Sequence, residues 1–214
     1  MKPFLIQTII LFLGLGFWVL SCQAGQGEKV KQAEYDALMA KVKNSDESVD
    51  FARLRQLATE LDSYAAADHG PSRNNMFAAL QRGDYKEAMK LAEKDLAANY
   101  LDVDAHIGAM AAAKGIGAAS QEAHHRYVAK GIIDSILRSG DGKTPETAFK
   151  VIAINEEYAT LRVLGLQVQG QALSHAGGHN FDIMTAVDPE TKSKREGYFN
   201  IDPIWAAESK NFGK

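Results

Sequence analysis

Apolar residues recur three and four positions apart on both sides of a short turn at Gly83-Asp84-Tyr85. This spacing places them along one side of each of two helices, so neither helix can bury its apolar stripe without a neighbour. The pattern therefore predicts a helical hairpin between Asn75 and Met110, with a third helix starting at its end. The apolar positions are Met76, Ala79 and Leu80 before the turn, and Tyr85, Ala88, Leu91, Ala92 and Leu96 after it.

More helices flank this hairpin. The same periodicity predicts helices from about Lys31 to Lys43, from Phe51 to about Ala66, and from about Ser120 to Arg138. Ser48 or Asp50 can cap the second of these, and Asp102 can cap the helix after the hairpin. Gly117 lies 34 residues after Gly83, also between two helical stretches, and about 34 residues is the period of tetratricopeptide repeats. The spacing indicates one such unit and a degenerate second one, with the flanking helices as caps.

The pattern changes at Lys143, where period-two alternation replaces the helical spacing. It predicts a strand over 149–152, then a short helix capped by Asn155 and ended by Gly165. Further strands are expected over 166–173, 181–188 and 195–201, joined by hairpin turns at 176–178 and 188–192. The fold class is therefore α+β: N-terminal helical hairpins with packing like that of tetratricopeptide repeats, then a small, mostly antiparallel sheet of about four strands.

The first residues have the features of a processed leader. Lys2 is followed by an apolar run from Phe4 to Leu20, which is typical of a secretory signal peptide. Val19-Leu20-Ser21-Cys22 is similar to a bacterial lipobox, in which the cysteine becomes the lipidated first residue, and cleavage after Ala24 is the alternative. We expect export to the cell envelope, in the periplasm or at the outer membrane, with a lipid anchor on Cys22. The predicted segments are a signal peptide at 1–21, a polar tether at 22–31, a helical hairpin region at 32–142, a β-rich unit at 143–205 and a tail at 206–214.

Composition excludes several classes of protein. The formal net charge of the 214 residues is −3, which does not indicate a nucleic-acid partner. Cys22 is the single cysteine, which rules out an internal disulfide framework and a cysteine-based zinc cluster.

Several motifs together resemble an uncharacterised bacterial family, domain of unknown function 4919. The resemblance covers about residues 32–202 and is most specific in the C-terminal part. Members of this family commonly look exported, and no catalytic residues are assigned to them, so the resemblance implies none here. The motifs are Val49-Asp50-Phe51, Leu54-Arg55, the run 139–149 (SGDGKTPETAF), Glu156-Glu157-Tyr158, Gly170-Gln171-Ala172-Leu173, Gly177-Gly178-His179 and Tyr198-Phe199-Asn200-Ile201-Asp202.

The histidines are the main candidates for metal ligands. Antiparallel packing of two helices can bring His106 near His124 and His125, and three imidazoles can hold zinc. No HExxH motif accompanies them, however, and adjacent residues on a helix point about 100° apart, which hinders both from serving one site. We predict structural histidines, with no metal site and no cofactor. Gly142-Lys143-Thr144 lacks the first glycine of a phosphate-binding loop, and Asp102-Val103-Asp104 lacks the glycine of a calcium loop.

Three glutamines form the other candidate site. Gln167, Gln169 and Gln171 lie two apart, so they should share one face of a strand, with Leu166, Val168 and Ala172 on the other. This face is either a solvated surface over an apolar core or a recognition surface for sugar or peptide groups, together with His179 and Tyr198.

No arrangement of residues in the sequence requires a particular chemistry. We expect an exported, lipid-anchored protein-interaction or binding module, with the membrane and an unidentified protein as partners and without catalytic residues. The alternative is an extracytoplasmic hydrolase that uses carboxylates and histidines of the β unit. An enzyme would need a nucleophile or metal, a base and an orienting group within hydrogen-bond reach in one pocket. The positions of Glu156, Glu157, His179 and Tyr198 should therefore distinguish the two.

Overall fold

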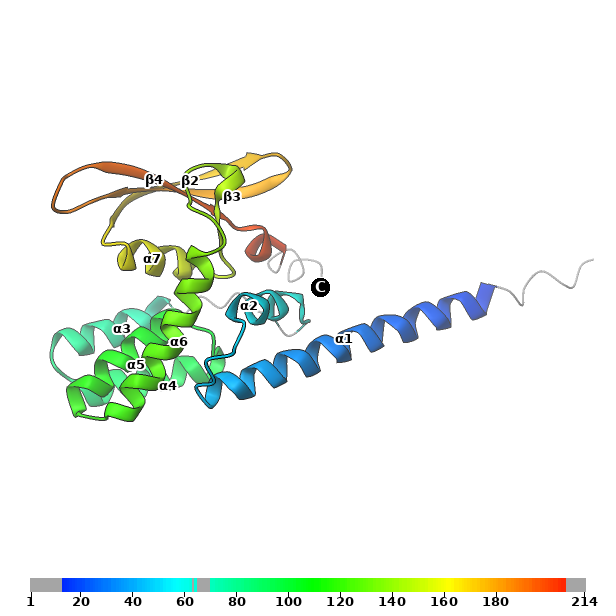
Figure 1. The fold of residues 1–214 in the computed structure, drawn as a ribbon, viewed down its shortest axis with the longest axis horizontal. Helices are drawn as coiled ribbons and strands as arrows, with labels where there is room; N and C mark the ends of the chain where they lie inside the picture. Colours follow the sequence, from blue (N-terminus) through cyan, green and yellow to red (C-terminus); the bar gives the residue numbers. More distant parts are fainter. Residues whose placement is uncertain (1–12, 63, 65–69, 207–214) are drawn as a thin grey trace, which may run out of the picture.

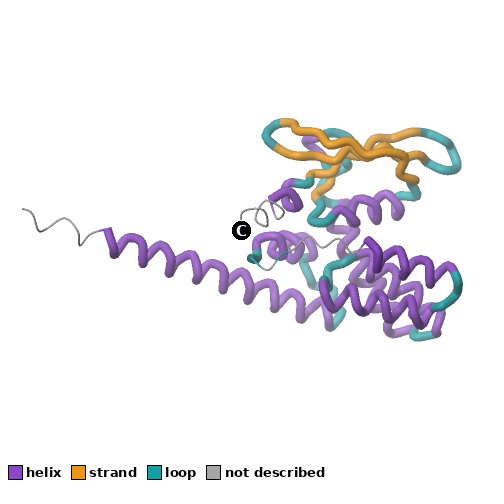
Figure 2. The backbone as a smooth tube through the Cα atoms, turned by 180° about the vertical axis from the view of Figure 1, so that it is seen from behind, coloured by secondary structure: helices purple, strands orange, loops and turns teal. Residues whose placement is uncertain are grey.

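The computed structural model describes residues 13–62, 64 and 70–206, with side chains described from residue 26 onward. A four-stranded sheet lies on one side of a layer of helices, and one long helix projects away from that layer (Figure 1). Seen from behind, helix α7 lies between the sheet and the helical layer (Figure 2). The predicted α+β class, with helical hairpins before the sheet, is confirmed.

The helical layer and the projecting helix α1 are formed by six helices in sequence order. They are α1 (Leu13–Lys43), α2 (Phe51–Glu60), α3 (Gly70–Gln81), α4 (Tyr85–Ala98), α5 (Val103–Ile116) and α6 (Ala119–Leu137). Each of α3 to α6 packs on the next one along the chain, as expected for helices joined by loops of a few residues. Asp50, Asp84 and Asp102 cap α2, α4 and α5 by accepting a hydrogen bond from the backbone N–H three residues later.

Two glycines make the turns of the helical layer in the same way. Gly83 and Gly117 have φ angles of 75° and 76°, a left-handed conformation that glycine adopts without steric cost. After α3, the N–H of Asp84 donates to the carbonyl oxygen of Ala79 at 2.9 Å. After α5, the N–H of Ala118 donates to that of Ala113 at 2.8 Å. Both turns thus satisfy the free carbonyls at a helix end by the Schellman pattern.

The first two helices differ from the sequence prediction. Helix α1 begins at Leu13 and not near Lys31, so the backbone of residues 22–31, predicted as a polar tether, is helical. Helix α2 ends at Glu60 and not near Ala66, because Leu61 takes an extended conformation and is buried, and the hydroxyl of Tyr64 donates to the carbonyl oxygen of Ile152. In the part of the chain that the structure describes, no helix is both long and apolar enough to span a membrane.

The sheet has the strand order β1-β4-β3-β2. Its strands are β1 (Phe149–Lys150), β2 (Gln167–Ala176), β3 (His179–Val187) and β4 (Lys194–Asn200), and helix α7 (Ile154–Val163) follows β1. Strand β1 is parallel to β4, and the other neighbours are antiparallel. Asn155 was expected to cap α7, which is wrong: the helix starts at Ile154, and the Asn155 amide donates to Asp102 of the helical layer.

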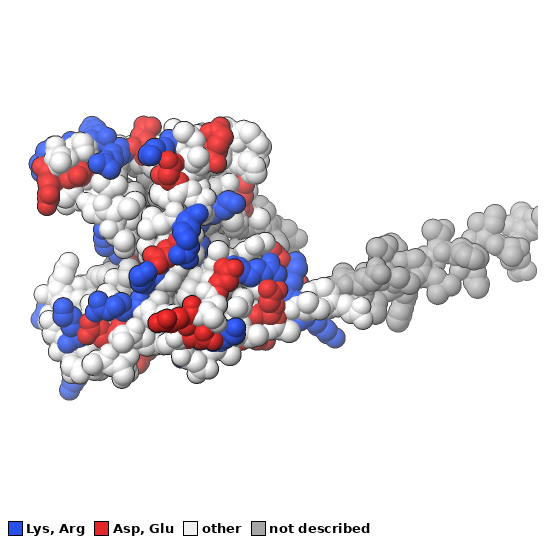
Figure 3. All heavy atoms as spheres, viewed as in Figure 1, with Lys and Arg blue, Asp and Glu red and all other residues white. Residues whose placement is uncertain are grey.

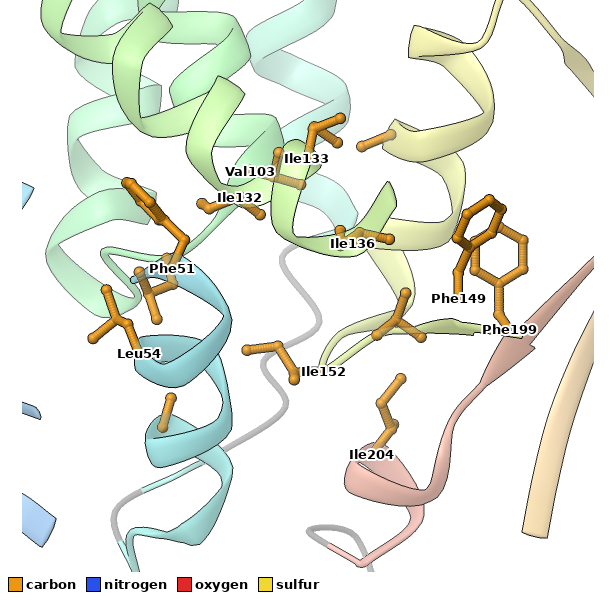
Figure 4. Packing of buried hydrophobic residues seen from close by; sticks show 14 of the residues in the cluster. Phe51, Leu54, Val103, Ile132, Ile133, Ile136, Phe149, Ile152, Phe199 and Ile204 are labelled. Carbon is orange, nitrogen blue, oxygen red and sulfur yellow. The ribbon is translucent and has the colours of Figure 1, made fainter. Parts of the chain in front are cut away.

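The main core joins the sheet to the helices. Phe51 and Leu54 of α2, Ile132 and Ile136 of α6, and Phe199 of β4 belong to one buried cluster (Figure 4). A second cluster lies between α3, α4 and α5 and is rich in alanine, including Ala88, Ala92 and Ala109. Small side chains let these helices approach closely. Of the hairpin positions predicted from periodicity, Tyr85 is exposed and Leu80 and Leu91 are half-buried, whereas the others are buried: Met76, Ala79, Ala88, Ala92 and Leu96.

Candidate functional site

A hollow of about 590 Å³ lies on the face of the sheet that points away from α7. We call it the His179 hollow. It is formed by the loop after α6, the β2–β3 turn and the ends of β1 and β4, and its volume is in the range of small-molecule sites. Its lining residues are Ser139, Pro145, Glu146, Ala148, Lys150, Ala176, Gly177, His179, Phe181 and Asn200.

His179 is oriented in the hollow by a carboxylate. Its Nδ1 lies 2.6 Å from Oδ2 of Asp202, and Oδ1 of Asp202 accepts hydrogen bonds from the backbone N–H and the side-chain amide of Asn180 at 2.8 and 3.2 Å. Burial opposes ionisation of Asp202, but these hydrogen bonds outweigh it and lower its pKa. An ionised Asp202 accepts from Nδ1–H, so Nε2 of His179 is left for a ligand or a proton.

Three other polar side chains that line the hollow, Lys150, Glu146 and Ser139, differ in their hydrogen-bond and ion-pair partners. Among the described residues, no acidic side chain forms an ion pair with Lys150. Hydrogen bonds from its own backbone and from Thr144 lower the pKa of Glu146. The hydroxyl of Ser139 donates to the carbonyl oxygen of Ile136 and accepts from the backbone N–H of Lys150, at 2.6 and 2.8 Å. The Ser139 hydroxyl is therefore held by two backbone hydrogen bonds, and neither of them activates it as a nucleophile.

The three glutamines do not share a face of β2, so that interpretation is wrong. Gln167 pairs with Val187, whereas Gln171 pairs with Met184, and the register shifts between Val168 and Gly170. A β-bulge adds one residue to one strand and reverses the alternation beyond it. Gln171 therefore faces α7, while Gln167 faces the other side of the sheet. Whether the exposed residues of the predicted recognition surface bind a ligand stays a prediction.

Gln171 is exposed, and it starts a chain of polar groups that leads from the surface to buried acids between the sheet and α7. Its amide donates to Asp182 at 2.5 Å and its carbonyl accepts from the hydroxyl of Tyr158 at 3.2 Å. Asp182 in turn lies beside Glu157, which is fully buried, and no described N–H or O–H group donates to either Glu157 oxygen. Burial and the neighbouring Asp182 raise the pKa of Glu157 to about 9. Glu157 is thus protonated at neutral pH and can donate to Asp182.

The neighbouring Glu156 has a different environment. It forms a buried ion pair with Arg55, with 3.0 Å between Nε and Oε1 and 2.5 Å between Nη2 and Oε2. The N–H of Ile152 also donates to it at 2.8 Å. Glu156 and Glu157 therefore lie under the sheet, and His179 and Tyr198 lie on the other face. These four residues do not converge on one pocket.

The three histidines of α5 and α6 do come together, as their spacing allowed. Nδ1 of His106 lies 3.0 Å from Nδ1 of His125, and Nε2 of His106 lies 2.8 Å from the carbonyl oxygen of Tyr100. A carbonyl only accepts, so Nε2 of His106 carries the proton and its Nδ1 accepts from His125. Both nitrogens of His124 are bonded, one to Ser45 and one to Tyr100.

Burial lowers the pKa of His106 to about 3 and that of His125 to about 4. Both rings are therefore neutral at neutral pH. Within residues 13–62, 64 and 70–206, no group of three or more histidine, cysteine, aspartate or glutamate side chains has the geometry to hold a metal ion. The expectation that these histidines are structural stays a prediction.

Sequence reasoning found His179 but missed Lys150, Glu146 and Asp202 as parts of one site. The signal was present in the motifs: the runs 139–149, 177–179 and 198–202 are far apart in the sequence, yet all three contribute residues to the hollow or to its support. Charge gave no such signal, because basic and acidic side chains are interspersed on the face seen in Figure 3.

Comparison with known proteins identifies a family but no characterised relative. The family model described as "Domain of unknown function (DUF4919)" matches residues 28–210. A search of curated proteins and a search of solved structures each found no match. The match covers most of the chain and agrees with the motifs that resembled this family. The protein therefore belongs to the DUF4919 family.

Proposed function

We propose that the protein is an exported, lipid-anchored binding module of the cell envelope, and that the His179 hollow takes a small polar ligand with a carboxylate group. One observation carries the ligand site: Lys150 lines the hollow without an ion-pair partner among the described residues, in company with His179. A carboxylate bound there would pair with the ammonium group of Lys150 beside the His179 ring. The end of a peptide chain is a ligand of this chemistry.

The helical layer supports a second contact surface. The two glycine turns lie one tetratricopeptide period apart and use the same hydrogen bonds, which favours packing like that of these repeats. Stacked helical hairpins of this type offer extended surfaces to protein partners. The leader and Cys22 support export and anchoring.

A hydrolase is the second candidate, because His179 and Asp202 form a base and its orienting partner. A base and an orienting group are two of the three parts that an enzyme needs. Ser139, the hydroxyl-bearing residue of the lining, is tied to the backbone. The arrangement thus favours binding over catalysis.

A thermal-shift experiment tests the binding site with a matched pair of ligands. N-acetyl-dialanine with a free carboxylate should raise the melting temperature of the full chain, because a ligand that binds only the native state adds RT ln(1 + [L]/Kd) to its stability. The C-terminal amide of the same peptide should not. Lys150→Gln should remove the response, and Lys143→Gln should retain it, since Lys143 is paired with Asp141 outside the hollow lining. Equal shifts with acid and amide, or a response that survives Lys150→Gln, would contradict the proposal.

A further inference from the structure

Among the described residues, strand β2 forms one edge of the sheet and pairs on its β3 side alone. Its ten residues span about 33 Å. None of them is Lys, Arg, Asp, Glu or Pro, the residues that commonly protect an edge strand from pairing with another chain.

The opposite edge of the sheet is built differently. Strand β1 has two residues and covers only the end of β4, opposite Phe199 and Asn200. The part of β4 that β1 leaves uncovered begins with Lys194, Arg195 and Glu196, all exposed. This contrast indicates that one edge is protected by charge and the other is not.

Most side chains of β2 are exposed, Leu173 among them. Leu173 is 61% exposed, although an apolar side chain of this size gains stability when it is removed from water. The bulge at Gln169 distorts one end of the strand and leaves residues 170–176 in regular register with β3. This regular segment offers a straight row of backbone donors and acceptors.

We propose that β2 pairs with β2 of a second copy of this chain, in antiparallel register, and so joins two four-stranded sheets into one. An isologous contact places the same strand opposite itself, which brings like charges together wherever the strand is charged. β2 has no Lys, Arg, Asp or Glu, so repulsion between such side chains is absent. The contact would also cover Leu173 of each copy.

Native mass spectrometry of the full chain released from detergent tests the pairing over a hundredfold range of concentration. The dimer fraction of the wild type should rise with concentration. Ala172→Lys places a charge at the middle of the exposed edge and should weaken the dimer about tenfold or more, because the contact is symmetric and both copies carry the charge. Thr185→Lys is the matched control: Thr185 lies on the central strand β3, and its dimer should equal that of the wild type.

Hydrogen exchange supplies a second measurement that does not depend on a variant. Alternate amides of 170–176 should gain protection as the concentration rises. A wild type that stays monomeric throughout the range would overturn the proposal, as would a dimer that Ala172→Lys leaves unchanged. Protection of β2 by an added extended peptide, with no self-association, would assign the edge to a different partner and equally overturn self-pairing.

Discussion

Glu156 and Glu157 are adjacent in the sequence and both are buried, but their carboxyl groups have opposite surroundings. Glu156 is paired with Arg55, whereas Glu157 lies beside another acid, Asp182. Two adjacent residues of α7 thus differ in charge: the ion pair with Arg55 requires an ionised Glu156, whereas ionisation of Glu157 beside Asp182 would destabilise the fold. Their two amide substitutions should therefore have opposite effects on stability.

Glu157→Gln should stabilise the protein at mildly alkaline pH and not at acidic pH. The pKa of Glu157 is raised from 4.5 to about 9 in the folded chain, so the native state holds a proton that the unfolded state loses as the pH rises above 4.5. The stability this group contributes is complete below that pH and is lost as the pH approaches 9. At mildly alkaline pH the variant should gain on the order of 2–4 kcal/mol, measured as the free energy of unfolding in urea.

Glu156→Gln is the matched control for this measurement. It leaves Arg55 buried without its counter-charge and should cost about 3–5 kcal/mol at neutral pH. A Glu157→Gln variant whose difference from the wild type does not change with pH would show that Glu157 is ionised in the folded protein.

At the scale of elements, the sequence predicted most helices and strands but not every end or face. Helices α4 to α7 and strands β2 to β4 lie within a few residues of the predicted ranges, because apolar periodicity decides which side of an element is buried. The bulge in β2 was not predictable, since it depends on the partner strand. The end of α2 was also missed, because the hydroxyl of Tyr64 bonds to Ile152, 88 positions later in the chain, a contact that the local sequence does not reveal.

The hairpin between α3 and α4 gives a direct test at this scale. Ala88 is fully buried in the alanine-rich cluster. Ala88→Leu should overpack the contact and cost roughly 1–3 kcal/mol, measured from the denaturation midpoint. Ala97→Leu, at an exposed position of the same helix, should leave the midpoint within experimental error. Equal midpoints for both variants would mean that α4 does not pack through Ala88.

At the scale of the whole molecule, α1 connects the folded part to the proposed anchor. Val42, near the end of α1, is fully buried, whereas Val30 is 68% exposed. The backbone N–H of Asp62 donates to the Glu28 carboxylate, and the six helical residues from Cys22 to Glu28 span about 9 Å, so the domain begins about 9 Å along α1 from the proposed anchor. The candidate ligand site was only partly predictable from the sequence, because its residues come from segments that are far apart in the chain and meet only in the folded molecule.

Lipidation of Cys22 predicts that the mature protein partitions with membranes and takes up labelled fatty acid, and that Cys22→Ala does neither. Each buried CH₂ of an acyl chain contributes about 0.8 kcal/mol, so two or more anchoring signals make the attachment stable. Membrane fractionation with metabolic labelling measures both effects. Recovery of the wild type as a soluble species starting at Gly25 would instead establish cleavage after Ala24.

We propose the His179 hollow as the ligand site of the protein, and binding there can be followed residue by residue. The most direct measurement is an NMR titration of the isotope-labelled chain with N-acetyl-dialanine, followed through the backbone amides. Saturable shifts should be confined to residues 139–150, 176–181 and 200–202, which form the hollow and hold Asp202. Shifts that map to the α3–α6 helices, or none at concentrations that saturate weak sites, would contradict this proposal.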